Sequence, residues 1–343
     1  MAIALFFFIS FIFLAFFKGT SIEYLTNDYL LGLFKNTFIL SFLTAFISAL
    51  IAMPLAILVT FYDFPGRKFF SWSLSLSIAF PAYVYAFIYV GIFEYSSPIS
   101  SYLRDFNIAL PSIKNLFGAS IILSMALFPY IYLLLRVKLA SVGLDLFRAA
   151  KSLGNNSTTS IFKVIIPSLL PVVIAGMTLV IFETIADFGG VSTLRIETFT
   201  VGIYNAWFGY QSYFSAARLA GYLLIFVFVI IFIAKFYESK QANLAQKTSE
   251  VFEGMELVPY KRFLATFYCG SIFTIVFLMP LGQLLIWSFE KNNFLSINNL
   301  HLFFNSLTLG LIVSVVTVFF GIALALAYRN EKNLRLIISI STS

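Results

Sequence analysis

Residues 34–60 read FKNTFILSFLTAFISALIAMPLAILVT, and Lys35 is the one charged side chain in this stretch. A helix of about 20 consecutive apolar residues is long enough to cross the hydrocarbon core of a membrane. Eight further apolar runs flank this one, at approximately 2–17, 71–94, 116–135, 167–187, 213–236, 263–289, 303–328 and from near 336. The sequence therefore predicts an all-α, polytopic transmembrane helical bundle with nine spans.

The composition agrees with a membrane location. Apolar residues make up 60% of the chain, 43 residues are Phe, and only 11% are charged. Soluble domains carry about a quarter charged residues, so lipid must cover much of this chain. The net charge of +7 does not indicate nucleic acid as a partner, because the basic residues lie in short loops between apolar runs. The single cysteine, Cys269, excludes internal disulfides, and the single histidine, His301, argues against a His-rich metal site.

The run at 2–17 is the shortest. It could be the core of a signal peptide, but no charged leader and no small-residue cleavage site accompany it. We therefore expect it to be a first span.

The lysines and arginines predict the orientation. If the N-terminus is cytoplasmic, 15 of the 22 basic residues lie in cytoplasmic loops and seven lie on the other side. Cytoplasmic loops of membrane proteins carry an excess of Lys and Arg. We therefore expect 61–70 and 237–262 to be cytoplasmic, and 96–115 and 188–212 to face outwards.

Two apolar runs resemble each other. Residues 34–60 align without gaps with 303–329 at an offset of 269, pairing Asn36 with Asn305, Thr37 with Ser306, and Leu55-Ala56 with Leu324-Ala325. Internal duplication is frequent in transporters. The sequence therefore predicts a first transmembrane unit over 1–236, a polar cytoplasmic linker over 237–262, and the start of a second, incomplete unit over 263–343.

The predicted cytoplasmic loop between the fourth and fifth spans is DLFRAAKSLGNNSTTSIFKVIIP, residues 145–167. Asp145 is a candidate N-cap for a short helix over 146–153. Gly154 can end this helix because it tolerates left-handed backbone geometry. Pro167 lies near the start of the next span, where its missing N–H costs little.

Within this helix, Ala149 and Ala150 leave a surface with little side chain, which another protein can approach closely. The segment resembles the cytoplasmic loop of binding-protein-dependent ABC importer permeases, whose pattern is Glu-Ala-Ala, three residues, Gly, nine residues, then Ile-x-Leu-Pro. The matching positions are Ala149, Ala150, Gly154, Val164, Ile166 and Pro167. Arg148 stands where the family has Glu, which puts any contact specific to that Glu in doubt.

The resemblance implies a fold and partners. In that family the loop is a coupling helix that docks into a groove on an ATPase subunit. The chain would then have the fold of a type I ABC importer permease in a bacterial inner membrane. Its partners would be two copies of the ATP-binding subunit, a soluble periplasmic or extracellular substrate-binding protein, and the lipid bilayer.

Residues 183–209, ETIADFGGVSTLRIETFTVGIYNAWFG, are similar to permeases of the ferric-iron type, which fuse two six-span units. The matching residues are Asp187, Phe188, Gly189, Thr198, Phe199, Thr200, Gly202, Ile203, Tyr204 and Trp207. The resemblance implies Fe³⁺ as the substrate. Thiamine, polyamine and sulfate permeases share the coupling loop, so these solutes stay open. A secondary transporter driven by an ion gradient is a more distant alternative.

Glu183 and Asp187 lie four residues apart and hence on one face of the fifth predicted span. Ionisable groups inside a span are costly and usually face protein or water. One hypothesis is that they line the translocation path and attract a cation. The alternative is that they are acids at the end of a helix, paired with Arg195 or Arg218.

Other candidates have structural interpretations: Pro81, Pro129 and Pro171 as residues that shape helices, Tyr83, Tyr85 and Tyr89 as packing or interfacial residues, and Trp207 and Tyr210 as interfacial anchors. The sequence holds no Gly-x-x-x-x-Gly-Lys-Ser/Thr phosphate loop. ATP would therefore be used by another chain, and we expect neither a cofactor nor enzymatic activity in this one.

Overall fold

The computed structural model describes residues 25–140, 144–238, 255–290 and 297–330. The predicted spans at 2–17 and from near 336 lie outside the described residues, as does most of the predicted linker. The described chain divides into two compact units, Met1–Gln283 and Leu284–Ser343.

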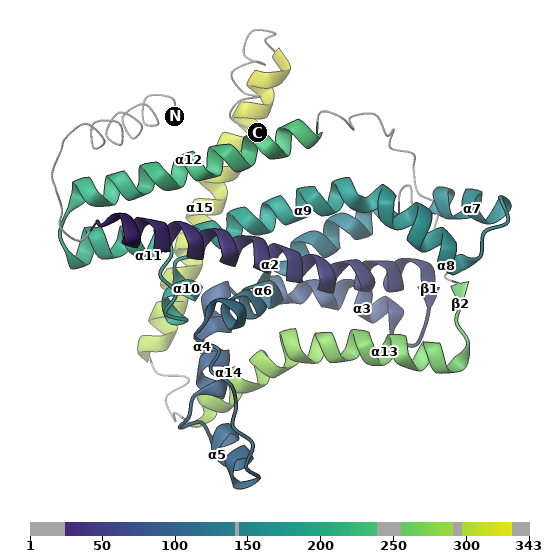
Figure 1. Cartoon of the computed structure of the whole chain (residues 1–343), viewed down its shortest axis with the longest axis horizontal. Coiled ribbons are helices and arrows are strands. Elements are labelled where there is room, and N and C mark those ends of the chain that lie inside the picture. The colour runs from purple at the N-terminus through teal and green to yellow at the C-terminus, as the bar shows by residue number, and fades with distance from the viewer. Residues whose placement is uncertain (1–24, 141–143, 239–254, 291–296, 331–343) are drawn as a thin grey trace. The chain divides into compact units, whose positions relative to one another are not determined.

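The described residues are almost entirely helical (Figure 1). In the first half of the chain the elements are α2 (Asn27–Phe61), β1 (Tyr62–Asp63), α3 (Arg67–Ser73), the 3₁₀ helix η1 (Leu74–Ala79), α4 (Ala82–Phe93), α5 (Pro98–Asp105), α6 (Leu116–Lys138), α7 (Leu144–Ser152) and α8 (Ser157–Ser160). They are followed by the π-helical η3 (Ile161–Ile165), α9 (Ile166–Ala186), α10 (Gly189–Thr193), α11 (Phe199–Tyr204), the π-helical η4 (Asn205–Gly209), α12 (Tyr213–Glu238), β2 (Met255–Glu256), α13 (Pro259–Phe273), the π-helical η5 (Thr274–Leu278), α14 (Met279–Glu290) and α15 (Ile297–Asn330).

By length and composition, six described helices could cross a membrane, or seven segments if one bent pair of helices counts as a span. These segments correspond to the predicted spans from 34–60 to 303–328. The prediction of an all-α polytopic bundle is therefore confirmed.

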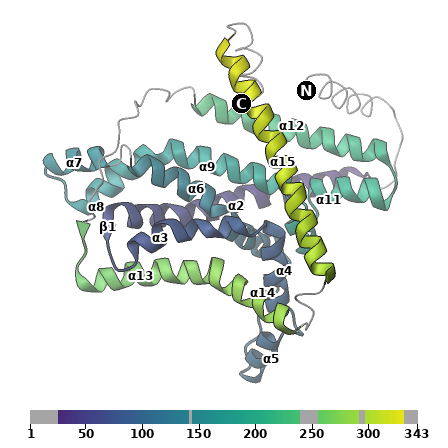
Figure 2. The same ribbon diagram turned by 180° about the vertical axis from the view of Figure 1, so that it is seen from behind.

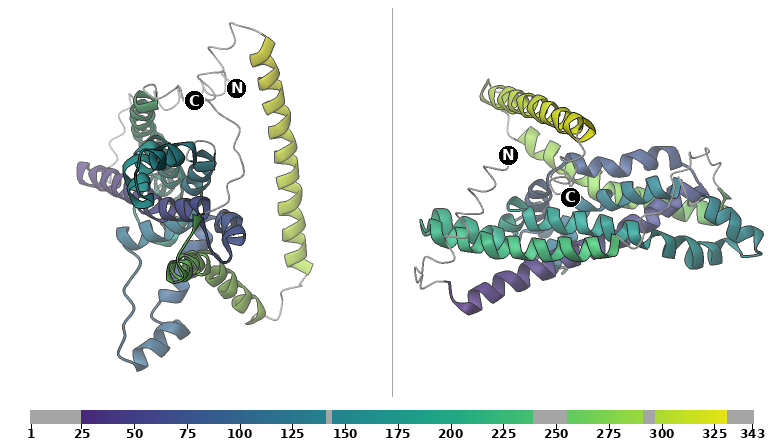
Figure 3. Two further views of the ribbon diagram at one scale, coloured as in Figure 1. Left: turned by 90° about the vertical axis from the view of Figure 1, so that its right-hand side faces the viewer. Right: turned by 90° about the horizontal axis from the view of Figure 1, so that it is seen from above.

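Helix α2 packs along α6 and α9, which also pack on each other (Figure 3). The buried face of α2 carries many small side chains, which include Thr37, Ser41, Ala45, Ser48 and Ala52. Small side chains let helix backbones approach closely in a membrane, where van der Waals packing drives association. A separate face of α2 exposes large rings at every fourth residue: Phe34, Phe38, Phe42 and Phe46. Exposed rings such as these four can face lipid.

The predicted span at 71–94 is wrong as a single helix. The segments Arg67–Ala79 and Ala82–Asp105 meet at an angle of 89°. The cause is Pro81, which has no N–H and forces the residue before it out of the helical region. Phe80 is accordingly extended, with φ −100° and ψ 119°. This stretch is a broken span or a re-entrant loop.

The loops predicted to be cytoplasmic gather at one end of the first unit (Figure 1). Here β1 pairs in parallel with β2, so that the described end of the predicted linker meets the first basic loop. Arg67 closes the last turn of α2 by donating from Nε to the carbonyl of Val59 (2.9 Å) and from Nη2 to that of Thr60 (3.0 Å). Helices α7 and α8 lie at this same end, opposite α11, as the reverse view also shows (Figure 2).

At the opposite end, the segment 188–212 forms short helices on α2. Asn36 Nδ2 donates to the carbonyl of Glu197 (2.9 Å), and the Phe199 amide donates to Thr37 Oγ1 (3.1 Å). Asn36 and Thr37 are the residues that the repeat aligns with Asn305 and Ser306. Their position in the first unit therefore has a structural reason, which is to hold this segment.

Helix α13 packs against α3 and η1, so the first compact unit continues to Gln283. The predicted start of the second permease unit at residue 263 comes from the sequence repeat and not from packing. It therefore stays a prediction. In the second unit, every side chain of α15 that is described, through Ala323, is exposed.

Candidate functional site

The predicted helix in the loop between the fourth and fifth spans is present as α7. It begins at Leu144, two residues earlier than expected. Asp145 therefore lies in its first turn and not before it, so the predicted N-cap position is corrected. The side chain of Asp145 lies outside the described part of the structure.

Gly154 ends α7 as predicted. Its φ is +86°, in the left-handed region. The Gly154 amide donates to the carbonyl of Lys151 (3.0 Å), and the Asn155 amide donates to that of Ala150 (3.2 Å). These two bonds form a Schellman motif, which satisfies carbonyls that a helix end otherwise leaves free. The motif makes the end of α7 a defined turn.

The two alanines of the loop have different environments. Ala150 is only 4% exposed, and Phe147 on the same face is also buried, with its ring 5.4 Å from that of Phe61. Ala149 is exposed, and Leu153 is 82% exposed. The expectation that both alanines form an open surface is therefore wrong for Ala150, which packs within its own chain.

The exposed side chains of α7 and of the residue that follows it are those of Arg148, Ala149, Lys151, Ser152 and Leu153. Leu153 carries no polar group that would favour contact with water, and Ala149 beside it lets another surface come close. Sequence reasoning missed Leu153, although its spacing of four residues from Ala149 places both on one face of the helix.

The rest of the loop is also packed. Asn156 Oδ1 accepts from the Thr159 amide (2.7 Å) at the start of α8. Helix α7 contacts η3, in which Ile161 and Ile165 are buried. Pro167 lies in the first turn of α9, as predicted. The loop is thus a compact helical hairpin joined to α2 and α9.

Glu183 and Asp187 line a cavity of about 330 Å³ in the first unit. Its walls come from the break between η1 and α4, from the middle of α6, and from the end of α9: Ile78, Phe80, Pro81, Ala82, Ala126, Leu127, Tyr130, Glu183, Ala186, Asp187 and Phe188. None of these lining residues is basic. The break at Pro81 thus forms part of the cavity wall.

The two acids differ in their contacts. Asp187 Oδ1 and Oδ2 accept from the amides of Gly190 (3.3 Å) and Val191 (3.0 Å), which start α10. The Asp187 carbonyl also accepts from Thr200 Oγ1 (3.0 Å). Asp187 is thus a cap that orders the following segment. Glu183, one turn earlier, is exposed at the cavity.

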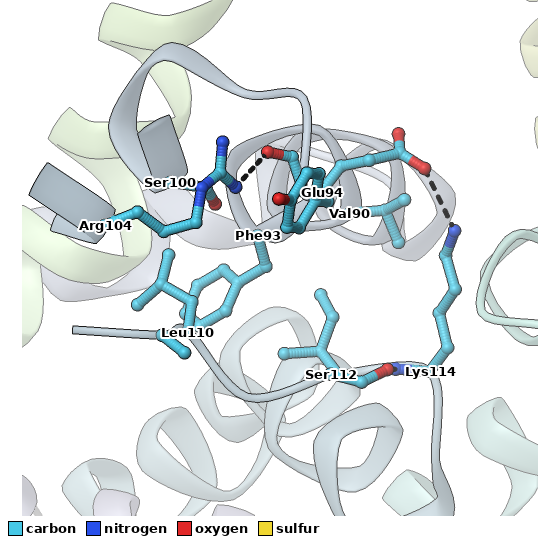
Figure 4. A pocket seen from close by; sticks show the side chains of 11 residues that line it. Val90, Phe93, Glu94, Ser100, Arg104, Leu110, Ser112 and Lys114 are labelled. Carbon is cyan, nitrogen blue, oxygen red and sulfur yellow. Dashed lines mark hydrogen bonds and ion pairs between the residues drawn. The ribbon is translucent and has the colours of Figure 1, made fainter. Parts of the chain in front are cut away.

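A second cavity, of about 320 Å³, lies between the end of α4, α5 and the segment before α6. Figure 4 shows Glu94 joined to Lys114, at 3.4 Å, on one side, and Arg104 on the other. Arg104 lies 3.7 Å from the centre of the Tyr95 ring and donates to the Tyr95 carbonyl at 2.5 Å. Since these charges bond to their own neighbours, we assign the cavity a structural role in closing this loop.

Within the described residues, no group of three or more His, Cys, Asp and Glu side chains could hold a metal ion. Cys269 is buried in α13, as expected for a packing residue. His301 lies in α15, where its Nδ1 is 3.2 Å from Asn305 Nδ2.

A family model described as "Binding-protein-dependent transport system inner membrane component" matches residues 52–250. The chain belongs to this family. Its matched region contains the broken span, the loop helix α7 and both cavity acids. Membership shows that the chain is a multi-pass inner-membrane permease component with the type I ABC importer permease fold.

Two relatives differ in solute. The chain is 24% identical to the sulfate transport system permease protein CysT of Escherichia coli (strain K12), over 49% of this chain and 60% of that protein. It is 23% identical to the Fe(3+)-transport system permease protein FbpB 2 of Haemophilus influenzae, over 78% of this chain and 50% of that protein. The chain thus spans 60% of the sulfate relative and 50% of the ferric relative, and these two relatives are named for different solutes.

Among solved structures, an amino acid ABC transporter crystallised with histidines aligns with a TM-score of 0.45 and 18% identity. The alignment covers 62% of this chain and 93% of that chain.

Proposed function

We propose that this chain is the membrane-spanning permease subunit of an ATP-binding-cassette importer in the inner (plasma) membrane of a bacterium. Two copies of a separate ATP-binding subunit would hydrolyse ATP, and a soluble substrate-binding protein would deliver the solute. The chain would provide the path by alternating access, with no cofactor of its own. The observation that carries the proposal is helix α7, which is fastened on one face and open on the other.

The contacts of α7 suit it to transmit force. Phe147 and Ala150 attach it to the end of α2 and to η3, which continues into α9. A displacement of α7 would therefore move both long helices, since buried packing resists deformation. The open face, with Ala149 and Leu153, is the surface that an ATP-binding subunit would cover.

The test is Ala149→Trp, which places a large ring on the open face without entering the core. We expect the variant to accumulate in the membrane normally, to lose the ATP-binding subunit on purification and to lose ATP-driven uptake. Ala109→Trp, on an exposed residue of the segment before α6, is the matched control and should keep both. Normal ATP-binding-subunit association in Ala149→Trp would contradict the proposed docking face.

For the solute, we propose ferric iron. The cavity at the helix break holds the exposed carboxylate of Glu183 and no basic residue among its lining. Carboxylate oxygens suit a hard cation and would repel sulfate. The alignment with the ferric permease also covers more of this chain than that with the sulfate permease, 78% against 49%.

Sulfate is the second candidate, because sulfate permeases recur among the relatives at similar identity. Uptake of radioactive iron and of radioactive sulfate in cells carrying the cognate binding protein separates the two. Glu183→Gln should lower iron uptake several-fold without loss of protein, while Glu94→Gln, outside this cavity, should not. Uptake of sulfate and not iron would overturn the choice of solute and leave the importer proposal intact.

We also propose that α15 is the counterpart of α2 in the second, incomplete permease unit predicted over 263–343. The offset of 269 places small residues of α15 at the positions of the buried face of α2: Ser306 for Thr37, Gly310 for Ser41, Ser314 for Ala45, Thr317 for Ser48 and Gly321 for Ala52. In α2 this face is covered by α6 and α9. The equivalent face of α15 would need equivalent helices.

A further inference from the structure

In the seventh predicted span, a proline and a change of helix register together leave two backbone carbonyls without their usual donors. Around η5 the helix hydrogen bonds shift from four to five residues, because the Met279 amide donates to the carbonyl of Thr274. With five-residue spacing, the carbonyl of Ile275 would accept from the amide of residue 280. With the usual four-residue spacing, the carbonyl of Val276 would accept from the same amide. Residue 280 is Pro280, which has no N–H.

Two tyrosines of α4 supply donors to these same two carbonyls. Tyr89 Oη donates to the Ile275 carbonyl at 2.6 Å, and Tyr85 Oη donates to that of Val276 at 2.7 Å. Tyr85 and Tyr89 lie four residues apart and so share one face of α4. Both side chains are buried. A membrane interior offers no water to replace such bonds, so each hydroxyl takes the place of a missing amide.

Tyr85 also lies beside the other proline break. Its hydroxyl is 3.2 Å from the carbonyl of Ser77, whose partner four residues along would be Pro81. The hydroxyl has one proton, and the shorter contact is the one to Val276. The Tyr85 side chain thus lies between the break at Pro81 and the π-helical turn η5.

We propose that Tyr85 and Tyr89 are positioning residues, whose hydroxyls donate to the two carbonyls that Pro280 and the register change at η5 leave without helix amides, and thereby fix α4 against η5. The position of α4 matters because its first residue, Ala82, lies in the wall of the cavity that contains Glu183. This pairing is independent of the solute and of the ATP-binding partner. It explains why both breaks persist in one unit.

The test is a double-mutant cycle on the full chain in detergent. Tyr85→Phe and Tyr89→Phe keep both rings and remove only the donors. Pro280→Ala restores one N–H, which can bond to one of the two carbonyls. If the hydroxyls act through these carbonyls, the pair of Phe substitutions should lower the apparent melting temperature by about 5 °C alone and by measurably less beside Pro280→Ala, where one of the two carbonyls has a backbone donor.

A distance measurement reports the position directly. Spin labels at Phe87→Cys on α4 and Phe267→Cys on α13, both exposed sites, are introduced in a Cys269→Ala background. The distance distribution should broaden or shift in Tyr85→Phe/Tyr89→Phe and return towards the original with Pro280→Ala. Tyr132→Phe is the matched control, since Tyr132 donates to the Ser71 carbonyl (2.9 Å), and its effect should be equal in both backgrounds.

A second route leaves Pro280 in place, in case Pro280→Ala does not accumulate. Replacing Tyr85 and Tyr89 with 4-aminophenylalanine keeps the ring and a donor, so it should restore the melting temperature and the distance that Phe loses. Equal losses with Phe and with 4-aminophenylalanine would overturn the proposal, as would equal effects of the Phe pair with and without Pro280→Ala.

Discussion

At the scale of single residues, the loop helix depends on backbone geometry at one position. Gly154 has a φ of +86°, and a Cβ added there would meet nothing within 4 Å. Any cost of a side chain at this position therefore comes from the backbone and not from a clash. Left-handed geometry costs most L-residues roughly 1–2 kcal/mol, and a β-branched residue more.

We predict that Gly154→Val unwinds the end of α7, because valine resists a positive φ. Protease cleavage within 152–156 should increase, and ATP-driven uptake should fall. Gly154→Asn is the matched control, since asparagine tolerates this region, and it should keep most activity. If Val and Asn behave alike, the Schellman turn is not what holds the loop.

At the scale of elements, the prolines have unequal effects. Pro54, Pro129 and Pro171 lie inside α2, α6 and α9 without ending them. Pro81 instead separates η1 from α4 at 89°. A hydrogen-bonded turn precedes it, because the Phe80 amide donates to the Ser77 carbonyl at 3.2 Å. The break then provides one wall of the cavity with Glu183.

We predict that Pro81→Ala lets η1 and α4 approach a continuous helix and so closes this cavity. In a Cys269→Ala background, a cysteine at Ala82 should react with a water-soluble thiol reagent when Pro81 is present and much more slowly in Pro81→Ala. Uptake should fall in parallel. Pro171→Ala, in an unbroken helix, serves as the comparison and should change neither. Undiminished labelling of Ala82→Cys in Pro81→Ala would show that tertiary packing alone maintains the break.

At the scale of the whole molecule, the repeat predicts how the second unit is built. The residues of α15 that correspond to the exposed rings of α2 are also large: Leu311 aligns with Phe42, and Val315 aligns with Phe46. Gly310 and Ser314 align with buried positions. The same offset predicts a counterpart of the 145–167 loop near position 414, beyond residue 343.

We predict that Gly310→Phe and Ser314→Phe prevent assembly of the importer, because a large ring cannot fit a face shaped for close helix contact. Leu311→Phe and Val315→Phe, on the face that corresponds to the exposed rings of α2, should be tolerated. The measurement is the yield of intact complex after purification. Equal yields for all four variants, or a native stop codon directly after Ser343, would contradict a second unit of this kind.

Several features were predictable because they depend on neighbours in the chain. The helix α7, its end at Gly154 and the start of α9 near Pro167 follow from local hydrogen bonds and backbone preference. The apolar runs predicted the long helices because a segment in lipid must form its backbone hydrogen bonds within itself. The different environments of Ala149 and Ala150 were not predictable. Neighbouring residues of a helix point in different directions, and only the packing of α7 against Phe61 and η3 decides which of the two alanines is buried.

The sequence by itself determined that this chain is a membrane helical bundle, that it belongs to a family of importer permeases, and where its loop helix lies. Composition, run length and local motifs are properties of short stretches, and they do not depend on distant contacts. Only the tertiary structure decided that Pro81 breaks its span while Pro129 does not. It also decided that the hydroxyls of Tyr85 and Tyr89 donate to helix carbonyls 191 and 186 residues away in the chain. Such partners come from packing, because a carbonyl without an amide bonds to whichever donor the fold brings near.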